Sequence, residues 1–220
     1  RNYVSFNFAA QKRAVTVQDY ESIIRTMPAQ FGAPAKVSIT ENDNKILIQI
    51  LSYDTQGRLT NIVSNTLRQN IANYLSNYRM MNDYISIFSA EVLDLSLDIS
   101  IVLDSAQNSG QVITSVIDKV STYFNPQTRQ LGQNVYISEL RSIIQNTNGV
   151  LTVAGIDVFN EVGGQYSSAE TSMVYSNPET KQIGPVDDTI FAQPNQVYQV
   201  RFPTKDIRVS VKNFQTITFS

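Results

Sequence analysis

The sequence predicts an α+β fold, in which a mixed sheet has helices packed on one face and is followed by a β-rich tail of hairpins. Three observations predict it. Apolar and polar residues alternate over Glu91–Asp104, which is the pattern of a single long strand. Amphipathic segments with helical spacing lie before and after this strand. From residue 160 onward, glycine and proline turns separate short apolar runs, which is typical of hairpins.

The long strand is expected to organise the rest of the chain. Its aliphatic face consists of Leu93, Leu95, Leu97, Ile99, Ile101 and Leu103. Its other face carries Asp94, Ser96, Asp98 and Ser100. Since successive side chains of a strand point to opposite faces, we expect the helices to cover the leucines. We expect the aspartate face to meet water or a neighbouring subunit.

The elements before the long strand begin with a helix that is capped by Thr16, with Asp19 three residues later as in a capping box. Its predicted buried stripe is Tyr20, Ile23, Ile24 and Met27, and Pro28 stops it. Two strands that form a hairpin and one helix follow, at Ala35–Thr40, Lys45–Tyr53 and Thr60–Asn77. The second strand is apolar on both faces, so we expect it inside the sheet.

The segment Arg79–Ala90 is rich in apolar side chains without a clear period, and is predicted to be a connection. It has two interpretations: burial within its own chain, or contact with a partner. The candidate partner interface consists of Met80, Met81, Tyr84, Ile85 and Phe88.

The elements after the long strand are a helix from Gly110 to Phe124, a short helix from Ser138 and a strand at Val150–Phe159 that is apolar on both sides. Asn148-Gly149 supplies the left-handed helix cap. Further short strands are predicted near Met173, Ile190, Val197–Phe202, Ile207–Val211 and Thr216–Phe219. The predicted organisation is an arm or strand over residues 1–12, an α+β core over 13–160 and a β-rich C-terminal subdomain over 161–220.

The composition argues against several classes of function. The net charge of −2 gives no reason to expect nucleic acid. The chain contains no histidine and no cysteine, which removes thiol nucleophiles, histidine bases, disulfides and zinc sites built from imidazole or thiolate. No apolar run is long enough to cross a membrane. Because the sequence begins with Arg1 rather than methionine, we expect a fragment of a longer protein.

Carboxylate groups remain as candidates for chemistry, and each has a simpler interpretation. Asp94 and Asp98 share a strand face but lie about 13 Å apart, too far to share a proton or one metal. The run 41–44 lacks the glycine and the distant glutamate of a calcium loop and is predicted to be a turn. Asp187-Asp188 and Gly163-Gly164 are likewise predicted to be a loop pair and a turn. We predict no catalytic residue, no metal ligand and no cofactor.

Arg13-Ala14-Val15-Thr16, followed by Asp19-Tyr20-Glu21, resembles the opening motif of the baseplate J-like wedge proteins of contractile phage tails. The order of hairpin, helix, long strand and helix, with Ile143-Ile144 before Gly149-Val150, follows that family over residues 13–160. Within the family, the C-terminal part of the T-even phage wedge proteins is the most similar. Asp19 and Tyr20 can serve the fold or meet a partner.

The resemblance implies a structural protein of the virion tail baseplate that is assembled in the host cytoplasm and is not an enzyme. Such proteins form homodimers, join the wedges into an inner ring around the hub and bind other baseplate wedge proteins. An alternative from the residues alone is a small-molecule-binding or hydrolytic α+β domain that uses carboxylates only. A third hypothesis, suggested by the β-rich tail, is a secreted adhesin-like module.

Overall fold

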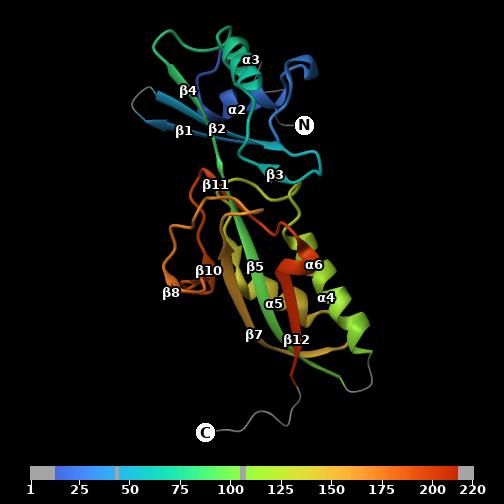
Figure 1. The fold of residues 1–220 in the computed structure, drawn as a ribbon. Helices are drawn as coiled ribbons and strands as arrows, with labels where there is room; N and C mark the ends of the chain where they lie inside the picture. Colours follow the sequence, from blue (N-terminus) through green and yellow to red (C-terminus); the bar gives the residue numbers. More distant parts are fainter. Residues whose placement is uncertain (1–12, 43–44, 105–107, 213–220) are drawn as a thin grey trace. The chain divides into compact units, whose positions relative to one another are not determined.

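The computed structural model describes residues 13–42, 45–104 and 108–212 (Figure 1). The chain forms two compact units, and the main division falls between Glu91 and Val92. The first unit also contains Gln130–Gly132 and Gln193–Gln196. This division differs from the predicted boundary near residue 160, because strand β7 (Val150–Glu161) runs across that point within the second unit. The predicted arm over residues 1–12 lies outside the described residues.

Helix α2 (Val17–Arg25) begins as its sequence predicts. The Thr16 hydroxyl accepts a 3.2 Å hydrogen bond from the Asp19 amide, and the Asp19 carboxylate accepts a 2.9 Å bond from the Thr16 amide. These reciprocal bonds satisfy N–H groups that have no partner inside the helix. The helix ends before Pro28, and the short 3-10 turn η1 (Ala29–Phe31) follows. The predicted capping box is therefore confirmed.

The first unit contains a four-stranded sheet with helices α2 and α3 on one face. Its further elements are β1 (Lys36–Asn42), β2 (Lys45–Tyr53), β3 (Leu59–Thr60), α3 (Asn65–Leu75) and β4 (Tyr84–Ser89). β1 and β2 form the predicted hairpin, and β2 is central because it also pairs with β3 and β4. Helix α3 begins at Asn65 rather than Thr60, because Leu59 and Thr60 pair with β2 and Ser64 caps the helix.

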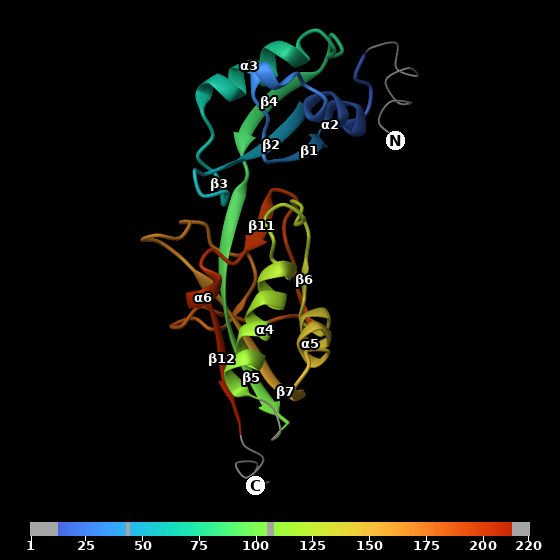
Figure 2. The ribbon, with the colours of Figure 1, turned by 90° about the vertical axis from the view of Figure 1, so that its right-hand side faces the viewer.

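The second unit is built around β5 (Glu91–Leu103), which continues into it from Val92. β7 pairs with one edge of β5 in antiparallel fashion, while β11 (Gln196–Gln199) and β12 (Ile207–Val211) pair with β5 as well. Helices α4 (Ser109–Tyr123) and α5 (Ile137–Gln145) lie on the same face of this sheet (Figure 2). The smaller elements are β6 (Val135–Tyr136), β8 (Tyr175–Asn177), β9 (Gln182–Ile183), β10 (Thr189–Ile190) and α6 (Pro203–Asp206).

The α+β class with helices on one face of a mixed sheet is thus confirmed, but the prediction of one continuous sheet is wrong. The four-stranded sheet of the first unit is separate from the six-stranded sheet and the two-stranded β6–β10 sheet of the second. Each large sheet covers its own hydrophobic core. Alternation and spacing identify strands and helices but do not say which strands pair, and this explains the difference.

The aliphatic face of β5 packs against α4 and α5, as predicted, with Leu93, Leu95, Leu97 and Ile101 fully buried. The opposite face differs from the prediction. Asp94 and Ser96 are also fully buried, because residues of the C-terminal part of the chain cover them. The expectation that these two side chains face water or another subunit is therefore wrong.

The remaining predicted strands agree in part with the structure. β8, β10, β11 and β12 lie close to the predicted positions. β11 ends at Gln199 and does not reach Phe202, which is the N-cap of α6. Strand β7 carries apolar residues on both faces, as predicted, and Leu151 among them is half exposed. The predicted strand at residues 216–219 lies outside the described residues. In the part of the chain that the structure describes, no helix has the length and apolar character that a membrane span requires.

Candidate functional site

The predicted partner-binding segment is mostly a strand and not the connection that we expected. β4 (Tyr84–Ser89) pairs in parallel with β2, so that Ile85 lies beside Ile46 and Ile87 beside Ile48. Ile85 and Ile87 pack on the core of the first unit, and Tyr84 and Phe88 point to the opposite face of the sheet. The segment has a period of two, but apolar residues on both of its faces concealed it.

The candidate interface residues are largely exposed. The exposed fraction is 98% for Met81, 72% for Tyr84 and 53% for Phe88, and Met80 is also exposed. Ile85 is the exception, since it is partly buried in its own unit. Burial within the same unit therefore accounts for the isoleucines but not for the methionines and aromatic residues. Their role as a partner interface stays a prediction.

The turn before β4 is held in place by α2 and by the chain around it. The Tyr20 hydroxyl donates a 2.5 Å hydrogen bond to the Asp83 carboxylate, and Tyr20 is almost fully buried. Burial, together with this hydrogen bond, raises the pKa of Tyr20 far above its usual range, so the phenol stays a donor. The Ala14 amide donates a 2.8 Å bond to the carbonyl of Tyr78. Thus Tyr20 supports the fold and also positions the exposed turn.

An open depression of about 530 Å³ lies at this turn. It is lined by polar, basic and apolar side chains, namely Arg13, Ser76, Asn77, Arg79, Met80, Met81 and Asn82. Methionine side chains are flexible and adapt to different apolar partners, and arginine is enriched at interfaces between proteins. The chemistry of the depression therefore suits a protein surface that carries both apolar and acidic groups.

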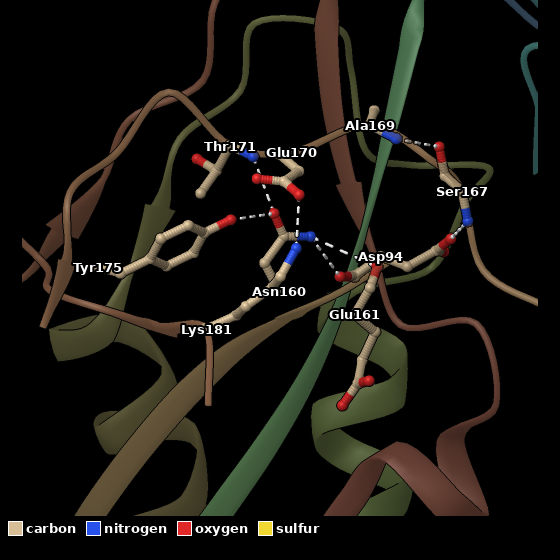
Figure 3. A network of polar contacts seen from close by, with 9 residues as sticks. All are labelled: Asp94, Asn160, Glu161, Ser167, Ala169, Glu170, Thr171, Tyr175 and Lys181. Atoms are coloured by element: carbon tan, nitrogen blue, oxygen red, sulfur yellow. Dashed lines mark hydrogen bonds and ion pairs between the residues drawn. The ribbon is translucent and has the colours of Figure 1, made fainter. Parts of the chain in front are cut away.

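Asp94, the first of the two candidate carboxylates, is part of a buried polar network (Figure 3). Its Oδ2 accepts a 2.6 Å hydrogen bond from the Ser167 amide, and its Oδ1 accepts a 2.9 Å bond from the Gln199 side chain. Burial raises the pKa of Asp94, although both hydrogen bonds and the nearby Arg201 act in the opposite direction. Both oxygens already have donors from the chain, so the carboxylate binds two distant segments to β5.

Asn160 extends this network from the neighbouring strand β7. Its side chain donates a 3.2 Å hydrogen bond to the backbone carbonyl of Asp94. Its Oδ1 accepts bonds from the Thr171 amide at 2.8 Å and from the Tyr175 hydroxyl at 3.1 Å. Figure 3 shows Asn160 between Asp94 and Tyr175. Asn160 is not among the predicted site residues, because a single asparagine at the end of an apolar strand carries no periodic signal.

Asp98, the second candidate carboxylate, has a different environment. It forms an ion pair with Arg208 of β12, and both side chains are about half exposed. Ser96 lies between the two aspartates along β5 and donates a 2.6 Å hydrogen bond to Glu161. Asp94 and Asp98 therefore belong to two different sites. This agrees with the prediction that they lie too far apart along the strand to act together.

The other candidate positions are turns. Asp187 and Asp188 have positive φ angles of 49° and 57° in the turn that connects Val186 with Thr189. Gly163 and Gly164, with φ angles of 81° and 63°, form a turn after β7. Residues 41 and 42 are the end of β1 in the β1–β2 hairpin. The described residues contain no group of three or more acidic side chains that could hold a metal ion.

Comparison with known proteins shows a likeness in fold. No family model matches the chain, and no curated protein matches it. Among solved structures, the chain is similar to one from a cryo-electron-microscopy structure of the anti-feeding prophage baseplate, 6-fold symmetrised. The TM-score is 0.58 at 13% sequence identity, over 88% of this chain and 39% of that chain. The chain thus shares its fold with part of that chain, and it spans less than half of that chain's length.

Proposed function

We propose that this chain is a structural component of the baseplate of a contractile tail. In this proposal it associates with itself and joins baseplate wedges into the inner ring around the hub during tail assembly. The observation that carries the proposal is the likeness in fold over 88% of the chain to a chain of the anti-feeding prophage baseplate. The resemblance of Arg13–Glu21 to the opening motif of the baseplate J-like proteins supports it as well.

The exposed surface around β4 suits a role in assembly. Met81, Tyr84 and Phe88 present large apolar groups on one unit of a chain whose net charge is only −2. Contiguous apolar surface on a folded protein is typical of a binding face, and aromatic residues and methionine are enriched in such faces. The partners proposed are a second copy of this chain and other baseplate wedge proteins, without nucleic acid, membrane or cofactor.

The proposal assigns a structural role to the carboxylates in place of a catalytic one. Both oxygens of Asp94 accept hydrogen bonds from Ser167 and Gln199, and Asp98 is paired with Arg208. In this proposal the two carboxylates stabilise the second unit through these hydrogen bonds and this ion pair. The location proposed for the protein is the virion tail baseplate, after assembly in the host cytoplasm.

Electron microscopy of the full-length protein, alone and mixed with the other wedge proteins of the same tail, tests this function. The proposal expects closed rings or defined wedge complexes that contain the protein. Light scattering measures the molar mass of the purified chain in solution, and we expect a mass above that of the monomer. A strict monomer at high micromolar concentration that also enters no complex with wedge proteins would overturn the proposal.

A further inference from the structure

The edge of β4 lacks the protection that the edges of β7 and β12 have. Exposed edges are usually guarded by charged side chains, proline or covering groups, since they otherwise pair with another strand. The edge of β7 is covered by Gln145, which bonds the Leu151 carbonyl at 2.7 Å and the Val153 amide at 3.2 Å. β12 carries Arg208. The β4 sequence, Tyr-Ile-Ser-Ile-Phe-Ser, contains no charged residue and no proline.

The outer edge of β4 has backbone groups ready for pairing. Within the described residues, β2 is the strand with which β4 pairs. Just after β4, the Ala90 amide donates a 2.9 Å hydrogen bond to the Ile50 carbonyl of β2. Backbone groups alternate between the two sides of a strand, so the amides and carbonyls of Ile85 and Ile87 are directed away from β2. Among residues 13–42, 45–104 and 108–212, no second strand pairs with this edge of β4, whose place in the first unit Figure 1 shows.

The side chains of β4 are self-complementary about Ser86. In an antiparallel pair of β4 strands centred on this residue, Tyr84 of one copy lies opposite Phe88 of the other. Likewise, Ile85 lies opposite Ile87, and Ser86 lies opposite its own counterpart. Aromatic residues thus meet aromatic residues on one face, and isoleucines meet isoleucines on the other. Such pairs directly across two strands stabilise a sheet.

We propose that two copies of this chain associate through β4, antiparallel and with Ser86 on the two-fold axis. The pairing joins the two four-stranded sheets into one continuous sheet through an isologous contact. Ile85 of each copy exchanges both backbone hydrogen bonds with Ile87 of the other, and Tyr84 and Phe88 become less exposed, because each contacts the other across the pair. This proposal names the surface for the self-association proposed above, and it rests on that function only for the expectation that copies of the chain meet.

A cysteine at the axis gives a direct test, because the chain itself contains no cysteine. Ser86 lies at a non-hydrogen-bonded position of the proposed pair, where opposite Cα atoms are about 4.5 Å apart, a distance that a disulfide can span. We expect Ser86→Cys to form a covalent dimer under mild oxidation. Ser38→Cys is the matched control, because Ser38 lies in β1 on the same face of the sheet as Ser86. This variant should stay largely monomeric in a gel that is run without reducing agent.

Charged substitutions of Ser86 test how tightly the two copies associate. Ser86→Lys and Ser86→Glu each place like charges across the axis, and we expect each variant alone to dimerise about tenfold or more weakly than the parent in light scattering. Their mixture should recover the dimer, because the two charges are then opposite. Circular dichroism should show that both variants fold as the parent does.

The outcomes separate this proposal from the proposed function. A parent dimer that is unaffected by Ser86→Lys and is not trapped by Ser86→Cys overturns the β4 pairing but leaves self-association in place. A cross-linked Ser86→Cys dimer, with no ring or wedge complex of the full-length protein, supports the pairing and counts against the baseplate role. A monomeric parent without any cross-link overturns both the pairing and the self-association.

Discussion

The hydroxyl of Tyr20 donates a 2.5 Å hydrogen bond to the Asp83 carboxylate, and this bond connects helix α2 with the turn that leads into β4. One buried side chain therefore links the core of the first unit to its most exposed apolar segment. The arrangement keeps Met80 and Met81 on the surface, because the turn that carries them has a fixed attachment on both sides.

Tyr20→Phe should loosen this attachment. The substitution keeps the aromatic ring but removes the donor to Asp83, so we expect the free energy of unfolding to fall by about 1–3 kcal/mol. Urea unfolding followed by circular dichroism measures the loss, and hydrogen exchange should report faster opening at residues 80–84. Tyr78→Phe is the control, since the Tyr78 hydroxyl forms only a 3.5 Å bond to Tyr74. Equal losses in the two variants would contradict the role given to Asp83.

Asp94→Asn should destabilise the second unit more than Asp98→Asn. An amide in place of the buried Asp94 carboxylate turns one acceptor into a donor that faces Ser167 or Gln199, at an expected cost of about 1–3 kcal/mol. The half-exposed pair of Asp98 with Arg208 should contribute about 0–1 kcal/mol. Urea unfolding of both variants at pH 7 compares the two, and the reverse order would show that the network of Asp94 adds little.

The difference in stability between the parent and Asp94→Asn should change with pH in a defined direction. Burial raises the pKa of Asp94 in the folded chain above its ordinary value of 3.8, so folding favours the protonated form. This contribution to stability is fully present below the ordinary pKa and is lost as the pH rises through the folded-state pKa. The difference in unfolding free energy between the parent and Asp94→Asn should therefore shrink from pH 3.8 upward. A difference that grows over this range would contradict the raised pKa.

Arg129→Ala should be costly, because Arg129 is only 2% exposed. Its guanidinium donates bonds of 3.0 and 2.9 Å to the carbonyls of Gln133 and Asn134 and lies 5.1 Å from the ring centre of Tyr123. We expect a loss of about 3–5 kcal/mol from the cavity and from the two hydrogen bonds that the guanidinium no longer donates. Arg141→Ala, which removes one 3.2 Å bond from an exposed arginine, should cost about 1 kcal/mol. Thermal unfolding measures both, and a similar shift in Tm would contradict the prediction.

Gln145→Ala should expose the edge of β7. Gln145 now binds the Leu151 carbonyl and the Val153 amide, so its removal leaves strand groups open to pairing with another chain. We expect a small loss of stability, about 1 kcal/mol, and a higher rate of aggregation in light scattering on mild heating. Gln111→Ala, on the exposed side of α4, is the control and should aggregate as slowly as the parent.

The parts of the fold that local chemistry specifies could be predicted from the sequence. The Thr16–Asp19 capping box, the β1–β2 hairpin and the alternation of β5 depend on residues that are close along the chain. β4 could not be predicted in the same way, because its apolar residues occupy both faces and its partner β2 is distant in sequence and parallel. The candidate interface was identified by its apolar content, but its strand geometry and its open edge come from the structure.

The sequence by itself determined which side chains of β5 share a face, since a strand has a period of two whatever surrounds it. It also determined the chemistry that the chain lacks, as it contains no histidine and no cysteine. Only the tertiary structure decided what covers each face. Asp94 and Asp98 have the same place in the alternation, yet one is buried under Ser167 and Gln199 and the other is half exposed beside Arg208. Burial depends on segments that are distant along the chain, and local alternation does not record which of them will pack there.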